Sequence, residues 1–176
     1  MESNEIQTGK SSPEAKRRRG RPRKSEEILM HKESSINPFS NLENPMEFIH
    51  HYRDMHYSEK EKLIKWGFTK NQLVCIKNVL LLDYPTLASF LHVTQRSLHL
   101  RKENDRLNPW INDRVGALLE LYCYALEVFA NPLDAREWLK SPTALLAGQS
   151  PLVMSCTHPG LLKTRELLYR IRLGQF

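Results

Sequence analysis

The sequence predicts an all-α protein, and three observations support this fold class. After residue 45, apolar residues recur at the i, i+3, i+4 and i+7 spacing of a helix face over most of the chain. Capping residues and prolines stand before several of these apolar runs. No segment alternates apolar and polar residues convincingly, so we expect no substantial sheet.

The first three predicted helices have their own start or stop signals. Apolar residues at helical spacing predict the first over residues 48–56. Ser58 is expected to cap the second, and Gly67 suits its C-terminal end. Thr69 followed by Gln72 forms a capping-box pattern just before the third.

Prolines and polar caps also mark the later helices. Pro85 fits the first turn of a short helix, and Thr94 caps another over residues 95–101. Asn108-Pro109 starts the longest helix, which is expected to end at about Ala130. Three shorter pieces follow, each opened by a proline: Pro132, Pro142 and Pro151. A final helix is expected from Pro159-Gly160 to Leu173, with Gly174 as its stop signal.

Charge and apolar content divide the 176 residues unevenly. The net charge of +6 indicates nucleic acid or another acidic surface as a partner. Residues 1–27 have too few apolar side chains to fold, so we expect a disordered tail, with residues 28–45 as a linker. We expect two domains beyond it, at residues 46–121 and 122–176.

The sequence lacks the features of membrane and secreted proteins, and this predicts where in the cell the protein is found. No apolar run is long enough to span a membrane, and the first ten residues contain no apolar stretch of a secretory signal. Cys75, Cys123 and Cys156 share no metal-ligand spacing and cannot all pair. We therefore expect a cytoplasmic protein with no membrane partner and with buried thiols.

A dense basic tract occupies residues 16–24, with seven positive charges in nine positions. Its centre resembles an AT-hook core and consists of Arg19, Gly20, Arg21, Pro22 and Arg23. An extended backbone with flanking arginines suits the narrow, negative minor groove of A·T-rich DNA. A solubilising tail, a nonspecific DNA arm and a nuclear import signal are the alternatives.

The segment Leu87 to Leu98 has the order of a helix-turn-helix: short helix, tight turn, second helix. The small Ala88 permits a close helix crossing, and Thr94 would direct the N-terminal end of the second helix toward DNA. The predicted DNA contacts are Gln95, Arg96, Ser97, His99 and Arg101. Gln pairs with adenine and Arg with guanine, whereas Arg101 and Lys102 would meet phosphates. Solvated helix faces and a dimerisation role are the alternatives.

From about residue 86 onward, the sequence resembles the Xre/MbcA/ParS-type antitoxins, the partners of RES-domain toxins. Leu87 to Leu98 is similar to the family's Xre-like helix-turn-helix, and Asn112-Asp113-Arg114 stands where the family tends to have Ser-Asp-Arg. Thr164 departs from the family's usual aliphatic residue, and Asn131-Pro132 replaces its usual Gly. The most specific match comprises Ala125, Phe129, Ala135, Trp138, Leu139, Pro142, Leu146, Gly148, Pro151, Leu152, Thr157, Gly160, Leu168, Ile171 and Gly174.

The resemblance implies an antitoxin that blocks an NAD-degrading RES-domain toxin and represses its own operon, as a homodimer on a two-fold operator. It implies that the C-terminal domain contacts the toxin, with its end near the toxin's NAD pocket. The residues implied are Arg165, Arg170, Arg172, Leu173, Gly174, Gln175 and Phe176.

We expect no catalysis, metal or cofactor. His50, His51 and His56 form the one histidine cluster, but His50 and His51 point to different helix faces. The sequence has no phosphate-binding Gly-rich loop and no nucleophile elbow. The main alternative to an antitoxin is a stand-alone DNA-binding regulator or architectural protein without a toxin.

Overall fold

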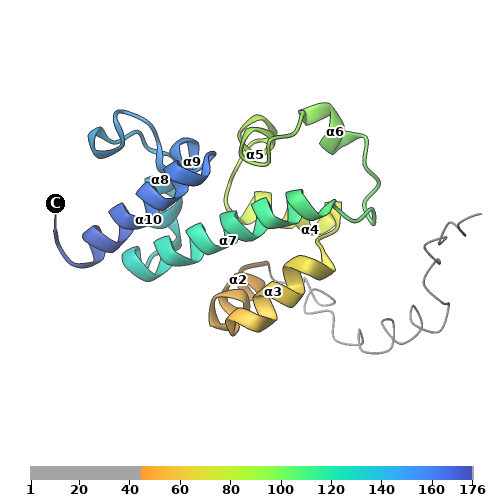
Figure 1. The fold of residues 1–176 in the computed structure, drawn as a ribbon, viewed down its shortest axis with the longest axis horizontal. Coiled ribbons are helices and arrows are strands. Elements are labelled where there is room, and N and C mark those ends of the chain that lie inside the picture. The colour runs from red at the N-terminus through yellow and green to blue at the C-terminus, as the bar shows by residue number, and fades with distance from the viewer. Residues whose placement is uncertain (1–44, 176) are drawn as a thin grey trace, which may run out of the picture. The chain divides into compact units, whose positions relative to one another are not determined.

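The computed structural model describes residues 45–175, and every regular element in this range is helical (Figure 1). Within it, β pairing is limited to the isolated bridges Thr69–Arg106 and Thr143–Gln149. The predicted all-α fold class is therefore confirmed. Residues 1–44, with the basic tract, lie outside the described residues, as does Phe176.

The first three helices are α2 (Pro45–Asp54), α3 (Tyr57–Trp66) and α4 (Lys70–Val79). The predicted capping box is confirmed, because Thr69 accepts from the Gln72 N–H while the Gln72 side chain accepts from the Thr69 N–H. The prediction that Ser58 caps α3 is wrong. The helix starts earlier, and His56 forms a capping box with Glu59 instead.

Gly67 ends α3 as predicted, with φ of 89° and its N–H donating to the Leu63 carbonyl. A Cβ at Gly67 would lie 2.7 Å from Nδ2 of Asn112, so this close approach also requires glycine. Asn112 is buried, accepts from the Phe68 N–H at 3.0 Å and donates to the Leu107 carbonyl at 3.1 Å. One amide therefore joins the α3–α4 connection to the loop before the longest helix.

Two short helices follow, α5 (Tyr84–Phe90) and α6 (Gln95–His99). Pro85 lies in the first turn of α5 as predicted, and the Asp83 carboxylate accepts from the Thr86 N–H at 2.9 Å. Thr94 caps α6 as predicted, and its hydroxyl accepts from the Ser97 N–H at 3.1 Å. The helix ends earlier than expected, since Leu100 is already its C-cap.

The second half contains α7 (Pro109–Phe129), α8 (Pro132–Lys140), η1 (Ala144–Leu146), α9 (Pro151–Met154) and α10 (His158–Arg172). The proline starts predicted for α7, α8 and α9 are confirmed. After Pro142 only the single 3₁₀ turn η1 forms. The final helix starts at His158, slightly before the predicted Pro159, because Thr157 is its N-cap.

Helix α7 organises the hydrophobic core. It packs against α2 and α3 on one part of its surface and against α8 and α10 on another (Figure 1). Its inward side chains are almost completely inaccessible, because neighbours on several sides cover them. These core residues are Ile111, Val115, Leu118, Leu119, Leu121, Tyr122, Ala125 and Leu126.

The predicted boundary between residues 121 and 122 falls inside α7. Both predicted domains therefore include part of the same helix, and the described residues 45–175 group within one compact unit. The division into two domains stays a prediction.

The prediction of buried thiols holds for Cys123, whereas Cys75 and Cys156 are half-buried. Burial raises the pKa of the Cys123 thiol to about 12 and also raises the pKa of Cys156. Raised thiol pKa values disfavour the reactive thiolate, as expected for core cysteines. Among the described residues, no single helix is both long and apolar enough to cross a membrane, and one bent pair, α4 with α5, passes by length and composition alone.

Candidate functional site

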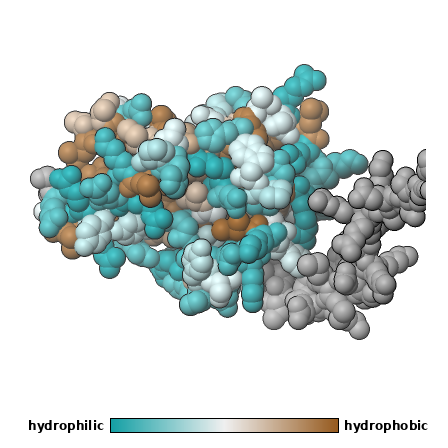
Figure 2. Space-filling model, viewed as in Figure 1, coloured by the Kyte–Doolittle hydropathy of each residue, from teal (hydrophilic) through white to brown (hydrophobic). Residues whose placement is uncertain are grey.

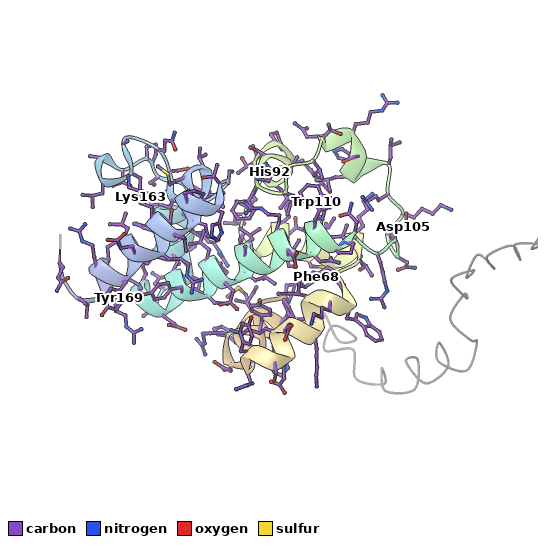
Figure 3. The ribbon with its side chains drawn as sticks, viewed as in Figure 1. Phe68, His92, Asp105, Trp110, Lys163 and Tyr169 are labelled. Atoms are coloured by element: carbon purple, nitrogen blue, oxygen red, sulfur yellow. The ribbon has the colours of Figure 1, made fainter. Side chains whose placement is uncertain are left out.

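Helices α5 and α6 are joined by a tight turn, which is the order of elements predicted for the helix-turn-helix unit. Ala88, on α5, and Leu98, on α6, are buried and fix the crossing of the two helices. The chain reverses through His92, whose φ of 53° lies in the left-handed region, and the Val93 N–H donates to the Ala88 carbonyl. Figure 3 shows His92 at this turn, beside α5. The turn is tight although it contains no glycine.

Two of the predicted DNA contacts on α6 are exposed in its first turn, and the other two also contact residues of the protein itself. Gln95 and Arg96 are exposed in the first helical turn, where a recognition helix contacts base edges. The Ser97 hydroxyl donates to the Thr94 carbonyl at 2.8 Å, so it also stabilises the helix start. The His99 ring lies 4.5 Å from the Tyr84 ring, between centroids.

Arg101 lies just beyond α6 and is half-buried. Its Nε is buried and has no hydrogen-bond partner. With its Nε buried, the Arg101 guanidinium can contact a DNA phosphate only through Nη1 and Nη2, and only if these atoms reach solvent. The tail residues Arg19 to Arg23 lie outside the described residues, so the AT-hook-like tract stays a prediction.

Helix α10 carries most of the predicted toxin contacts, and its N-terminus is fixed by a close packing contact. The Thr157 hydroxyl accepts from the Gly160 N–H at 3.2 Å. A Cβ at Gly160 would overlap the carbonyl oxygen of Met154, so only glycine fits. Thr164, noted above as a departure from the resemblance, is buried and donates its hydroxyl to the Gly160 carbonyl at 2.9 Å. The buried Thr164 hydroxyl therefore finds its hydrogen-bond acceptor within α10 itself, four residues earlier in the same helix.

The exposed face of α10 has an apolar ridge with basic residues on both sides. Leu162, Tyr169 and Leu173 are 54%, 55% and 50% exposed, and helical periodicity aligns them along one line, which the exposed Glu166 interrupts between Leu162 and Tyr169. The same periodicity places Arg165 and Arg172 on one flank of this ridge and Lys163 and Arg170 on the other. We call the three apolar residues, together with the four basic residues that flank them, the α10 ridge. Figure 3 shows Lys163 and Tyr169 along this helix.

The predicted toxin contacts at the end of α10 are all exposed where they are described: Arg165, Arg170, Arg172, Leu173, Gly174 and Gln175. Arg172 Nη1 lies 3.9 Å from the Glu127 carboxylate of α7, a loose ion pair that an acidic partner could replace. Gly174 has φ of 68° and ends the helix as predicted. The resemblance missed Leu162 and Tyr169, although their spacing on the final helix could have identified them.

Apolar side chains reach the surface elsewhere in the C-terminal part as well. Figure 2 shows apolar patches among hydrophilic side chains at the end of the molecule that carries η1, α9 and α10. Leu133, Leu145 and Val153 are each at least half exposed. Together with the α10 ridge, they give residues 125–175 more exposed apolar side chains for their length than residues 45–124 have. Gathered exposed apolar side chains are typical of a protein-binding surface.

Arg114 on α7 joins the helix-turn-helix unit to the segment that precedes α10. Its Nε donates to the Phe90 carbonyl at 3.0 Å, and its Nη2 donates to the Ser155 and Cys156 carbonyls at 3.0 and 3.1 Å. The His92 ring also contacts the Cys156 carbonyl, with Nε2 at 2.7 Å. Burial lowers the pKa of Arg114, but a guanidinium keeps its charge in proteins.

No group of three or more His, Cys, Asp or Glu side chains among residues 45–175 is placed to hold a metal ion. His50 and His51 are exposed on α2, and His56 is engaged as the N-cap of α3.

Comparison with known proteins supports a binding role for the C-terminal part. No curated protein matches the chain. A family-model match begins at Ala125, the first residue of the most specific part of the resemblance, and ends at Gly174, the glycine that closes α10. Residues 125–174, which comprise the end of α7 and all of α8 to α10, match the family model of the antitoxin Xre/MbcA/ParS C-terminal toxin-binding domain, so this part of the chain is similar to antitoxin toxin-binding domains.

Proposed function

We propose that this protein is the antitoxin of a toxin–antitoxin pair and that it blocks a RES-domain, NAD-degrading toxin. The observation that carries the proposal is the match of residues 125–174 to an antitoxin toxin-binding domain. The α10 ridge lies within this match and is the exposed surface best suited to the toxin, because an apolar centre with a charged rim is the usual anatomy of an interface.

Inhibition would follow from the chemistry at the end of α10. Arg170 and Arg172 can donate bidentate hydrogen bonds to carboxylates in a pocket that otherwise holds a dinucleotide. Leu173 would supply an apolar anchor beside them. Phe176, the last residue, belongs to the same proposal on sequence grounds alone.

We also propose that the protein represses its own operon. The exposed first turn of α6 supports this proposal, because Gln95 and Arg96 stand where a recognition helix contacts bases. A homodimer would match two-fold related half-sites. The basic tract of residues 16–24 would add phosphate contacts and a salt slope of up to about −6 in log K.

Co-expression with a candidate RES-domain toxin tests the antitoxin proposal. The full-length protein should restore growth and cellular NAD, and deletion of Arg172 to Phe176 should weaken both while leaving DNA binding intact. Charge reversal of Lys62, exposed on α3, is the control and should rescue fully. Full rescue by the deletion would show that the C-terminal end does not block the toxin.

A stand-alone DNA-binding regulator is the second candidate, and the helix-turn-helix geometry of α5 and α6 favours it independently of the toxin. Under that function, the protein would bind its promoter duplex but form no complex with the purified RES-domain protein. Removing residues 1–27 would then test the tail, since an unchanged affinity would show that the basic tract does not contact DNA.

A further inference from the structure

Helix α6 is too short to be stable by itself. It has five residues, whereas isolated helices below roughly 12 residues are marginal in water. The side chains proposed to contact DNA stand on this helix, so its orientation must be fixed by surrounding residues. DNA recognition requires such fixation, because base contacts depend on the exact placement of a few side chains.

Three contacts fix the start and the inner face of α6. Thr94 caps its N-terminus, and Leu98 is buried in the core. On the outer side, the His99 ring packs on the Tyr84 ring of α5. These contacts leave the carbonyl groups at the C-terminal end of α6 to be satisfied by another partner.

Lys70, at the first position of α4, is that partner. Its ammonium donates to the His99 carbonyl at 3.0 Å and to the Arg101 carbonyl at 2.6 Å, across about thirty positions of sequence. Its backbone N–H donates to the Asp105 carbonyl at 3.1 Å, and the next residue, Asn71, donates to the Glu103 carbonyl at 3.0 Å. A cation at a helix C-terminus also interacts favourably with the helix dipole.

We infer that Lys70 is a positioning residue for DNA recognition, which holds the C-terminal end of α6 and the following loop so that Gln95 and Arg96 face the groove. This inference rests on the proposed DNA-binding function. Lys70 is half-buried, and two of its three ammonium donors are engaged by backbone carbonyls. Its charge therefore acts inside the protein, and a direct phosphate contact is the competing role.

The salt dependence of DNA binding separates these two roles. A lysine that contacts a phosphate contributes about 0.9 to the slope of log K against log[salt], whereas a lysine that positions a helix contributes nothing. Lys70→Met in the full chain should weaken binding to the promoter duplex by about tenfold, since charge-assisted hydrogen bonds are lost. Affinity for a scrambled duplex and the salt slope should stay unchanged.

Three further variants calibrate the measurement. Lys70→Arg should restore promoter binding, because a guanidinium can donate to both carbonyls. Lys102→Met removes an exposed charge in the adjacent loop, so it should weaken both duplexes and reduce the slope by about 0.9. Lys62→Met on α3, which is exposed and distant in sequence from α6, should change neither quantity.

Hydrogen exchange on the free protein tests the same inference without DNA. In Lys70→Met, the amide of Leu100, which donates to the Arg96 carbonyl, should exchange faster, while amides in α7 should not change. An unchanged Leu100 amide, unchanged promoter affinity, or a slope reduced by about 0.9 would each overturn the inference. If the wild type does not prefer its promoter over the scrambled duplex, the DNA-binding proposal itself fails, and the exchange experiment still reports on Lys70.

Discussion

The Arg114 guanidinium stacks on the Phe90 ring, with Cζ 4.4 Å from the ring centroid, and donates to the carbonyl of the same residue. Through its other nitrogen it reaches the carbonyls of Ser155 and Cys156. One side chain on α7 therefore closes the C-terminal ends of both α5 and α9. This contact joins the helix-turn-helix unit to the matched toxin-binding domain.

Loss of the Arg114 side-chain contacts should destabilise the protein strongly. Arg114→Met would remove this donor from the carbonyls of Phe90 and Ser155 and leave the Cys156 carbonyl with the His92 ring alone, and we expect a loss of about 2–4 kcal/mol in the free energy of unfolding. Arg165→Met, an exposed arginine on α10, is the control and should change stability by less than about 0.5 kcal/mol. Urea denaturation measures both, and equal effects would contradict the role given to Arg114.

Gly160 should not tolerate even a methyl group. In Gly160→Ala, the new Cβ would overlap the Met154 carbonyl, so α10 would have to move away from α9. We expect a loss of about 3 kcal/mol. Gly148→Ala is the matched comparison, because nothing lies within 4 Å of its Cβ and only its φ of 78° opposes the change, at about 1 kcal/mol. Equal thermal shifts in the two variants would show that packing at Gly160 is not tight.

Asp83 should make the stability of α5 depend on acid pH. The Thr86 hydroxyl and backbone N–H hold the pKa of Asp83 below its usual value. A carboxylate with a lowered folded-state pKa stabilises the fold above the unfolded value of 3.8, and this contribution is lost as the pH falls through the folded value. The difference in Tm between wild type and Asp83→Asn should therefore shrink below about pH 4. A difference that stays constant from pH 7 to pH 2.5 would contradict this prediction.

The α10 ridge should be required for binding the toxin. Tyr169→Asp places a charge at the centre of the ridge and should weaken binding to the RES-domain protein by at least about tenfold, since interface centres tolerate charge poorly. Tyr57→Asp is the control, because Tyr57 is 78% exposed on α3, outside the ridge. Isothermal titration calorimetry measures both, and equal losses would place the toxin contact elsewhere.

Local sequence signals determined the helices of this protein. Thr69, Thr94 and Thr157 cap helices, and Pro109 and Pro132 start them, because a hydroxyl or a proline acts on the backbone within one turn. The resemblance likewise pointed to the C-terminal part of the chain, where residues 125–174 match the family model of an antitoxin toxin-binding domain. The exception among the caps is Ser58, which His56 replaces.

Only the tertiary structure decided the contacts between segments that are distant in sequence. The left-handed conformations of His92 and Ala130 carry no glycine signal, because packing of the flanking helices imposes them. Likewise, no local pattern shows that Lys70 closes the end of α6 or that Arg114 joins α5 to α9. A long cationic side chain is compatible with many partners, and the partner it acquires depends on which helix ends the folded core brings within its reach.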